Sequence, residues 1–441
     1  MASQGIKGPP CKFIHGCTKE ISKLKKDVMM KMNEPMTNVS HEILPIVEPH
    51  IHKWNKLYGD IKKILGDGLV ATEGKKWARQ RRLAHLAFHG ESLKGMIPAM
   101  VDSVHALLDR WQKLEAKEVE LFEEFAMITS DVISRTAFGS SYIEGREIFQ
   151  MLSELTIVVS INLFKLRLPR IRKIWKTSDD IKSERLEKAI CDALLGIIEK
   201  REKKVNVGEM DDYGNDYLGS LLKAYHDPDK SKRITIDDLM DECRTFHLSG
   251  QETTTSILTW TIFLLAIHKD WQEEARKEVT DVFGNEDPNH EGIMKLKTVG
   301  MIINESLRLY PPVVNTIRKV VRQVTLGDLV LPQGIALQIP ILTIHHSPRI
   351  WGDDVHLFKP ERFREGVAGA VSNDAAAAFL PFGLGPRNCV GSNFTTTEVK
   401  IILAMILRHY SFTVSPDYVH LPSQILTIRP QHGLKVILHP L

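Results

Sequence analysis

The stretch "PFGLGPRNCVGSNF", residues 381–394, decides how this chain of 441 residues is interpreted. A lone cysteine, Cys389, stands there among glycines, a proline and an arginine, directly before the strongly helical pattern "VGSNFTTTEVKIILAMILRHY". Glycines permit left-handed or crowded backbone, and the start of a helix favours a thiolate over a thiol. The stretch therefore predicts a tight turn that presents a reactive sulfur, whereas a buried structural cysteine in an ordinary loop is the alternative.

A thiolate at a helix start, with glycines leaving room for a flat molecule, is suited to be an axial ligand of haem iron. Arg387, two residues before the sulfur, can pair with a haem propionate. The pattern Phe-x-x-Gly-x-Arg-x-Cys-x-Gly occupies ten positions, from Phe382 to Gly391. It resembles the haem-binding loop of the cytochrome P450 superfamily, and this resemblance implies haem contacts from Phe382, Gly383, Arg387 and Cys389.

Composition excludes several other classes of protein. Lys plus Arg is 58 and Asp plus Glu is 55, so the net charge of +3 leaves no footprint of a nucleic-acid binder. Five cysteines without a Cys-x-x-Cys pair argue against a disulfide framework and a structural zinc site, and they fit a reducing compartment. We expect no dinucleotide site, because neither Gly-x-Gly-x-x-Gly nor a phosphate loop occurs, so electrons must come from a partner protein.

Helical periodicity dominates the chain, and strand-like pieces are short and late. We predict one mainly α domain with small β-sheets (α+β) over residues 1–441, in which 1–60 is a lead-in and 61–441 is the haem-binding core. The expected helices are 93–115, 120–138, 179–203, 236–267 and 270–284. The expected strands are 324–332, 336–342 and 425–439, the last folding back through Gly433 as a hairpin.

Three further stretches match the superfamily. "NESLRLYPP" and "FKPERF" supply Glu305, Arg308 and Arg362, which the resemblance implies form a buried structural cluster that holds the cysteine loop. A Glu–Arg pair three residues apart is otherwise a common surface pair. "WARQR" supplies Trp77 and Arg81, implied to contact the haem propionates, with Arg318 as a further partner; a basic helix face is the alternative for Arg81.

The third stretch, "SGQETTTS" at 249–256, matches the oxygen-activation segment inside the 236–267 helix. Gly250 followed by hydroxyls can open a groove in a helix, in which dioxygen and a water would sit. The resemblance implies that Thr253 holds these molecules and that Glu252 relays protons. Hydroxyls that bond back to their own helix are the alternative. By resemblance alone, the pocket is mostly apolar, and its candidate residues are Phe246, Ser249, Val313, Val314 and Ile425.

Stretches such as "LGDGLVATEGKKWARQRR" and "PILTIHHSPRIWG" are similar to the plant 72 clan of the superfamily. This resemblance implies haem b, a terpenoid substrate, dioxygen, electrons from NADPH–cytochrome P450 reductase, and attachment to the endoplasmic reticulum membrane. We see no signal peptide, and the longest apolar stretch, 257–268, is too short to span a bilayer, so we expect no anchor helix in the sequence as written. Also, residues 53–60 run straight into 61–70 where the clan has strands and a helix, which suggests a lost internal segment.

Three functions remain open at this point. The first is a monooxygenase that inserts one oxygen atom of dioxygen into a C–H bond and reduces the other to water. The second is a non-oxidative haem-thiolate isomerase, which the presence of both Glu252 and Thr253 disfavours. The third is a truncated, catalytically weak or silent product, and a carbon-monoxide difference spectrum would discriminate it from the others.

Overall fold

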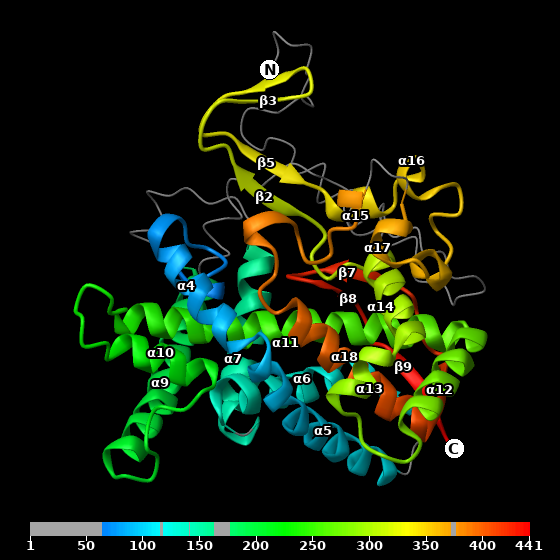
Figure 1. Cartoon of the computed structure of the whole chain (residues 1–441), viewed down its shortest axis with the longest axis horizontal. Helices are drawn as coiled ribbons and strands as arrows, with labels where there is room; N and C mark the ends of the chain where they lie inside the picture. Colours follow the sequence, from blue (N-terminus) through cyan, green and yellow to red (C-terminus); the bar gives the residue numbers. More distant parts are fainter. Residues whose placement is uncertain (1–63, 115–117, 141, 163–176, 372–375) are drawn as a thin grey trace.

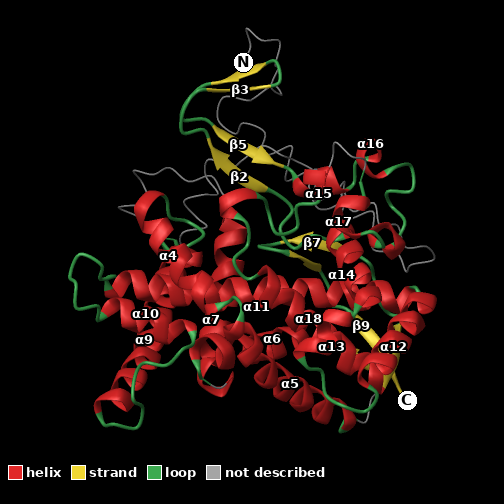
Figure 2. Ribbon diagram, viewed as in Figure 1, coloured by secondary structure: helices red, strands yellow, loops and turns green. Residues whose placement is uncertain are grey.

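The computed structural model describes residues 64–114, 118–140, 142–162, 177–371 and 376–441. Its long helices are, in chain order, α4 (Gly74–Ala87), α5 (Glu91–Gln112), α6 (Leu121–Phe138), α7 (Tyr142–Asn162), α9 (Ser178–Asn206), α10 (Tyr217–Tyr225), α11 (Ile236–Ile267), α12 (Lys269–Phe283), α14 (Lys297–Leu309) and α18 (Ser392–His409). The fold is mainly helical, as predicted (Figures 1 and 2). Among the described residues, no helix combines the length and the apolar character needed to cross a membrane.

Short helical turns follow α12 and α14 and lead to the cysteine loop. They are α13 (His290–Lys295), α15 (Ile341–His345), α16 (Pro348–Trp351), η2 (Pro360–Phe363), α17 (Gly366–Gly369), η3 (Ala376–Ala378) and η4 (Gly385–Arg387). The strands are β1 (Glu118–Glu120), β2 (Thr316–Lys319), β3 (Val324–Leu326), β4 (Leu329–Leu331), β5 (Ala336–Ile339), β6 (Tyr410–Val414), β7 (Pro422–Gln424), β8 (Ile428–Pro430) and β9 (Lys435–Pro440).

Helix α11 forms the centre of the helical part and contacts α6, α14 and α18 (Figure 1). It begins with a capping box, because Thr235 Oγ1 accepts from the Asp238 N–H at 3.0 Å and Asp238 Oδ2 accepts from the Thr235 N–H at 3.1 Å. Its second half is buried on all sides; Trp260, for example, is fully buried and stacks on Tyr310 with ring centroids 4.4 Å apart. The predicted bounds of this helix, 236–267, agree with the structure.

The strands form small antiparallel sheets. β1, β9 and β6 make one sheet in that order, and β2–β5, β3–β4 and β7–β8 are pairs. In Figure 1 β3 lies at the top of the view, and the β2–β5 pair lies below it, next to α15. The β3–β4 pair exposes apolar side chains to solvent, among them Leu326 and Val330.

All three strand predictions differ from the structure. The segment 324–332 is two short strands, β3 and β4, that pair with each other across the turn at Gly327 and Asp328. The segment 425–439 is not a hairpin: Gly433 does turn, at φ +74°, but β8 pairs with β7 and β9 pairs with β1 and β6. Glu120 Oε1 accepts from the Leu434 N–H at 2.7 Å and draws the chain toward β1. The strand expected at 336–342 ends at Ile339, because Pro340 precedes the helical turn α15. The lead-in 1–60, the join at 60–61 and the absence of an anchor concern residues outside those described.

Candidate functional site

The turn that carries Cys389 is held by its own backbone. The Gly383 N–H donates to the Leu380 carbonyl at 2.9 Å, and the Cys389 N–H donates to the Phe382 carbonyl at 2.7 Å. Gly383 and Gly385 have φ of +70° and +76°, which disfavour other residues. Helix α18 begins at Ser392, so the sulfur lies three residues before its first turn.

The Cys389 thiol experiences opposing influences. Burial raises its pKa, while a hydrogen bond from the Gly391 backbone and the charge of Arg81 lower it. The residue nevertheless keeps exposed surface, although protein surrounds it. A cation bound beside this accessible sulfur would stabilise its thiolate form.

Three arginines from separate elements gather at this turn. Arg81, on α4, donates to the Asn388 side-chain oxygen at 2.8 Å and also to the Asn388 carbonyl. The Arg387 guanidinium lies over the Trp77 ring, 4.5 Å from its centroid. Arg318, on β2, donates to Thr316 Oγ1 at 2.6 Å, and burial together with the charge of Arg387 lowers its pKa.

The residues at this turn fit a haem group. Among the described residues, Arg81, Arg318 and Arg387 form no ion pair with a carboxylate, which leaves positive charge for an anionic ligand such as two propionates. A Cβ on Gly385 or Gly391 would meet no atom within 4 Å, so the turn leaves open space at both glycines near the sulfur. A soft thiolate with nearby cations and an apolar surface is the donor set of a haem-thiolate site.

The predicted groove in α11 is not present in this structure. The helix is continuous from Ile236 to Ile267, and Thr253 Oγ1 donates back to the Ser249 carbonyl at 2.7 Å. Ser249 and Thr254 make the same kind of bond, to Thr245 and Gly250. A Cβ on Gly250 would lie 2.9 Å from Ile133 Cδ1, so this glycine lets α11 pack closely against α6. The hydroxyls therefore follow the alternative pattern, bonding to their own helix.

Glu252 is buried against the C-terminal strands rather than free. Its Oε1 accepts from the Thr427 hydroxyl at 3.0 Å. Burial raises the pKa of Glu252, and the neighbouring Arg429 and the Thr427 bond oppose the rise. Thr427 and Arg429 had no signal in the sequence, because they lie about 175 residues away from Glu252 along the chain.

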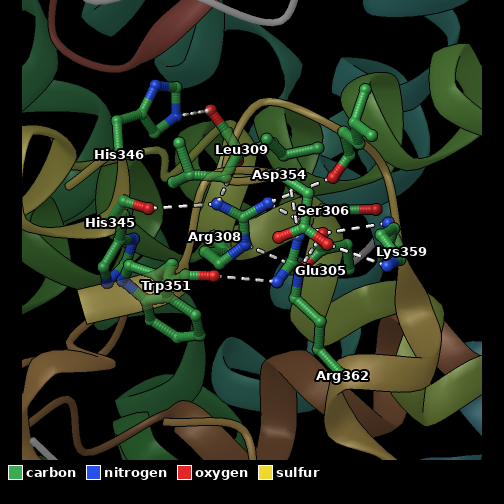
Figure 3. Close-up of polar contacts among 12 residues, drawn as sticks. Glu305, Ser306, Arg308, Leu309, His345, His346, Trp351, Asp354, Lys359 and Arg362 are labelled. Carbon is green, nitrogen blue, oxygen red and sulfur yellow. Dashed lines mark hydrogen bonds and ion pairs between the residues drawn. The ribbon is translucent and has the colours of Figure 1, made fainter. Parts of the chain in front are cut away.

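The structure brings Glu305, Arg308 and Arg362 together (Figure 3). Arg308 donates to both oxygens of Glu305, at 2.7 and 2.8 Å, and both side chains are fully buried. Arg362 Nε lies 3.4 Å from Glu305 Oε1, and the Lys359 N–H donates to the same oxygen at 3.0 Å. Burial raises the pKa of Glu305, and the Arg308 hydrogen bonds are the main influence that opposes the rise.

The cluster also binds backbone that leads to the cysteine turn. Arg308 donates to the carbonyls of His345 at 3.0 Å and Val355 at 2.7 Å. Arg362 donates to the Trp351 carbonyl at 3.0 Å and the Asp354 carbonyl at 2.6 Å. The sequence analysis did not single out His345. The signal available to it was the pair His345–His346 directly before Ser347 and Pro348, and both rings are buried in the structure.

The candidate pocket residues are dispersed. Phe246 packs in an aromatic cluster, 4.3 Å from Tyr217 and 5.2 Å from Phe88 between ring centroids, so it belongs to the core. Val314 is buried and its carbonyl accepts from Leu342, whereas Val313 is exposed. Ser249 and Ile425 are half-buried.

Comparisons with known proteins agree with these features. A family model described as cytochrome P450 matches residues 51–438. A cyanobacterial cytochrome P450 with bound retinoic acid, CYP120A1, superposes with a TM-score of 0.75 at 25% identity, covering 87% of this chain and 83% of that one.

Plant proteins are more similar in sequence. Cytochrome P450 CYP749A22 from Panax ginseng is 50% identical over 99% of this chain and 90% of its own. The 11-oxo-beta-amyrin 30-oxidase of Glycyrrhiza uralensis is 44% identical over 86% of this chain and 74% of its own. The ginseng alignment spans 477 positions, 36 more than the 441 residues here, so that relative has at least 36 residues without a counterpart in this chain.

The cytochrome P450 family model matches nearly all of the described residues, including the cysteine turn and the arginines around it. Members of this family bind haem b and use dioxygen with electrons supplied by a redox partner. The chain therefore belongs to the cytochrome P450 family and is a haem-dependent monooxygenase.

Proposed function

We propose that this protein inserts one oxygen atom of dioxygen into a C–H bond of a terpenoid, with electrons from an NADPH–cytochrome P450 reductase. The observation that carries the proposal is the Cys389 turn, an accessible sulfur surrounded by three arginines from separate elements that pair with no carboxylate in the described part of the chain. The substrate class is supported by relatives named as oxidases of 11-oxo-beta-amyrin, a triterpenoid.

Cys389 is proposed as the axial ligand, with Phe382 and Gly383 shaping the turn. Arg81, Arg318 and Arg387 would bind the propionates, and Trp77 would hold the Arg387 guanidinium by its ring face. Haem b, once bound to this thiolate, supplies the chemistry that cleaves dioxygen. Glu305, Arg308 and Arg362 are structural in this proposal: they hold the backbone that precedes the turn.

Glu252 and Thr253 are proposed to manage protons. Burial raises the pKa of the Glu252 carboxyl, which favours its holding a proton, and Arg429 nearby stabilises its charged form, so the group can exchange a proton. The Thr253 hydroxyl donates to the Ser249 carbonyl, and it would rotate away from this bond to donate toward dioxygen or a water. Of the pocket candidates, Ser249, Val313, Val314 and Ile425 remain in the proposal, and Phe246 is assigned to the core.

We also propose a single domain, with residues 61–441 as the haem-binding core and 1–60 as its lead-in. The plant relatives support a place on the cytosolic face of the endoplasmic reticulum membrane, where the reductase would dock. No nucleic acid is expected as a partner, because the charge is balanced.

Product profiling tests the proposed function. The chain would be co-expressed with a plant reductase in a host that makes β-amyrin-type triterpenoids, and extracts would be analysed by mass spectrometry. We expect a product heavier by one oxygen atom that labels from ¹⁸O₂ and disappears in the Cys389→Ala variant. Absence of any oxidised terpenoid would contradict the proposed substrate class, and a label from water would contradict monooxygenation.

A second candidate is a weak or silent product of a shortened gene. It is favoured by the relative's surplus of at least 36 aligned residues and by the resemblance-based expectation of a lost segment at residues 60–61. A carbon-monoxide difference spectrum separates the two: a silent chain would give no thiolate-type Soret band, whereas the proposed enzyme would give one.

A further inference from the structure

His345 lies between the Glu305–Arg308–Arg362 cluster and the cysteine turn. It is the last residue of α15 and is fully buried. Its carbonyl accepts from Arg308 Nη1 at 3.0 Å, and its ring Nε2 accepts from the Leu380 N–H at 2.9 Å. Figure 3 shows the contact of its backbone with the cluster, and the bond to Leu380 adds a contact of its side chain with the cysteine turn.

Leu380 is the residue from which the cysteine turn starts. Its carbonyl accepts from the Gly383 N–H at 2.9 Å, and Phe382 inside this turn accepts from the Cys389 N–H at 2.7 Å. The His345 ring also stacks on Phe379, with centroids 5.5 Å apart and planes at 22°. Hydrogen bonds joined by short covalent segments of His345, Leu380 and Phe382–Gly383 therefore connect Arg308 with the backbone of Cys389.

The direction of the ring bond determines the chemical form of His345. A backbone N–H can only donate, so Nε2 must accept and the ring proton must be on Nδ1. Burial, with smaller contributions from His346 and Arg308, lowers the pKa of His345 to about 3, so the ring is neutral at physiological pH and keeps its acceptor.

We propose that His345 is a positioning residue for Cys389: its Nε2 lone pair holds the Leu380 N–H and so orients the turn that presents the thiolate. The inference rests on the proposed role of Cys389 as the haem ligand. His345 makes two separate contributions. Its backbone carbonyl accepts from Arg308, and any amino acid at this position would supply that carbonyl. Its ring nitrogen accepts from the Leu380 N–H, and few other side chains place an acceptor at that distance from the backbone.

Paired substitutions test the acceptor. His345→Gln places an amide oxygen near the position of Nε2, whereas His345→Phe keeps a ring of similar size without an acceptor. His346→Phe is the matched control: His346 is also buried, with its pKa lowered to about 3, but its Nε2 donates to the Leu309 carbonyl on α14 instead of holding the turn. If His345→Phe is insoluble, His345→Asn, whose shorter side chain withdraws the acceptor, replaces it.

Two measurements on the holoenzyme form the readout. The first is the ratio of the thiolate-type Soret band to the shorter-wavelength inactive band in the ferrous–carbon monoxide spectrum. The second is hydrogen–deuterium exchange of the peptide that contains Leu380. For His345→Phe we expect the inactive fraction and the exchange rate to rise about tenfold, the size of one lost buried hydrogen bond.

His345→Gln should stay near wild type in both measurements, and His346→Phe should lower the melting temperature without changing either. Wild-type behaviour of His345→Phe, or equal effects of His345→Phe and His346→Phe, would overturn the positioning role. A thiolate-type band that persists in Cys389→Ala would instead refute the ligand assignment, and the exchange measurement would still report on the His345–Leu380 bond.

Discussion

Cys389 illustrates how single residues are tuned by their immediate neighbours. Burial raises the pKa of its thiol, and the Gly391 N–H and Arg81 act in the opposite direction. Arg81 is itself oriented by Asn388, the residue before the cysteine, through both the carbonyl and the side-chain oxygen. The turn therefore carries its own counter-charge, and a metal cation at the sulfur would complete the stabilisation of the thiolate.

The first prediction at this scale concerns the ligand. Cys389→Ala should abolish the thiolate-type Soret shift of the ferrous–carbon monoxide complex, because alanine offers no donor atom. Cys191→Ala is the control, since Cys191 is half-buried on α9 and should leave the spectrum unchanged. Retention of the shift in Cys389→Ala would exclude this residue as the ligand.

The second prediction concerns the Thr253 hydroxyl. Thr253→Ala should keep normal haem content but divert most of the electrons from NADPH into hydrogen peroxide, because the donor to oxygen and water is lost; we expect coupling to fall about tenfold. Thr261→Ala removes the same type of hydroxyl, bonded to the Ile257 carbonyl at 2.7 Å, two turns further along α11. Unchanged coupling in Thr253→Ala, or an equal loss in Thr261→Ala, would show that the proposed role is wrong.

Elements α14, α15 and η2 are joined by one buried carboxylate. Glu305 binds Arg308 on its own helix, Arg362 on η2 and the Lys359 N–H, while Arg308 reaches the carbonyl of His345 on α15. Glu278 on α12 in turn accepts from the N–H groups of Lys297, Thr298 and Val299 and caps α14. Helix α14 is thus held at its first residues by the Glu278 carboxylate and near its last residues by the ion pairs of Glu305.

The prediction for these elements is a large loss of stability in Glu305→Ala. Removing the carboxylate leaves the fully buried Arg308 without its charge partner, which costs about 3–5 kcal/mol, whereas Arg362 keeps its ion pair with Asp354. We expect little soluble, haem-loaded protein and a clearly lower midpoint in chemical unfolding. Glu274→Ala, an exposed position on α12, is the control and should change the midpoint little. Haem content and unfolding midpoint at wild-type values in Glu305→Ala would contradict a structural role for the cluster.

At the scale of the whole molecule, buried carboxyls shape the pH dependence of stability. Burial raises the pKa of Glu242 from 4.5 to about 7, although the Tyr217 hydroxyl donates to its Oε2 at 2.5 Å. Between these two values the folded chain binds more protons at this site than the unfolded chain. The contribution of Glu242 to stability is therefore present below pH 4.5 and is lost as the pH rises toward 7.

Glu242→Gln tests this contribution. The amide cannot ionise, so the free energy of unfolding of the variant should increase relative to that of wild type as the pH rises. The difference should reach about 3 kcal/mol at pH 8, because the pKa of Glu242 in the folded chain, about 7, lies above its ordinary value of 4.5. At pH 4.5 the difference should be small. Unfolding midpoints across this range provide the measurement, with Glu274→Gln as an exposed control; a constant difference at all pH values would refute the linkage.

The last prediction concerns the internal segment that plant relatives have and this chain lacks. Within the described residues β2 pairs with β5 alone, and the β3–β4 pair exposes Val324, Leu326 and Val330. Exposed edges and apolar side chains favour aggregation. We expect weak haem retention and little turnover for the chain as written, and recovery of both when a homologous segment is inserted after Asp60. Equal haem occupancy and turnover of the two forms would show that the deletion is tolerated.

The sequence by itself determined whatever depends on short separations along the chain. The ten positions around Cys389 and the helical pattern of α11 each involve residues that interact within a few positions, so their pattern is visible without a fold. The same holds for Glu305 and Arg308, three residues apart on α14.

Only the tertiary structure decided which distant groups meet. Glu252 pairs with Thr427, His345 binds Leu380, and β9 pairs with β1 and β6 instead of folding back on β8. The hydroxyls of α11 bond to their own helix, and Phe246 joins Tyr217 and Phe88 in the core. These contacts form because residues far apart in the chain compete for buried positions and for hydrogen-bond partners. The result of that competition depends on the whole fold, so it cannot be predicted from neighbouring residues in the sequence.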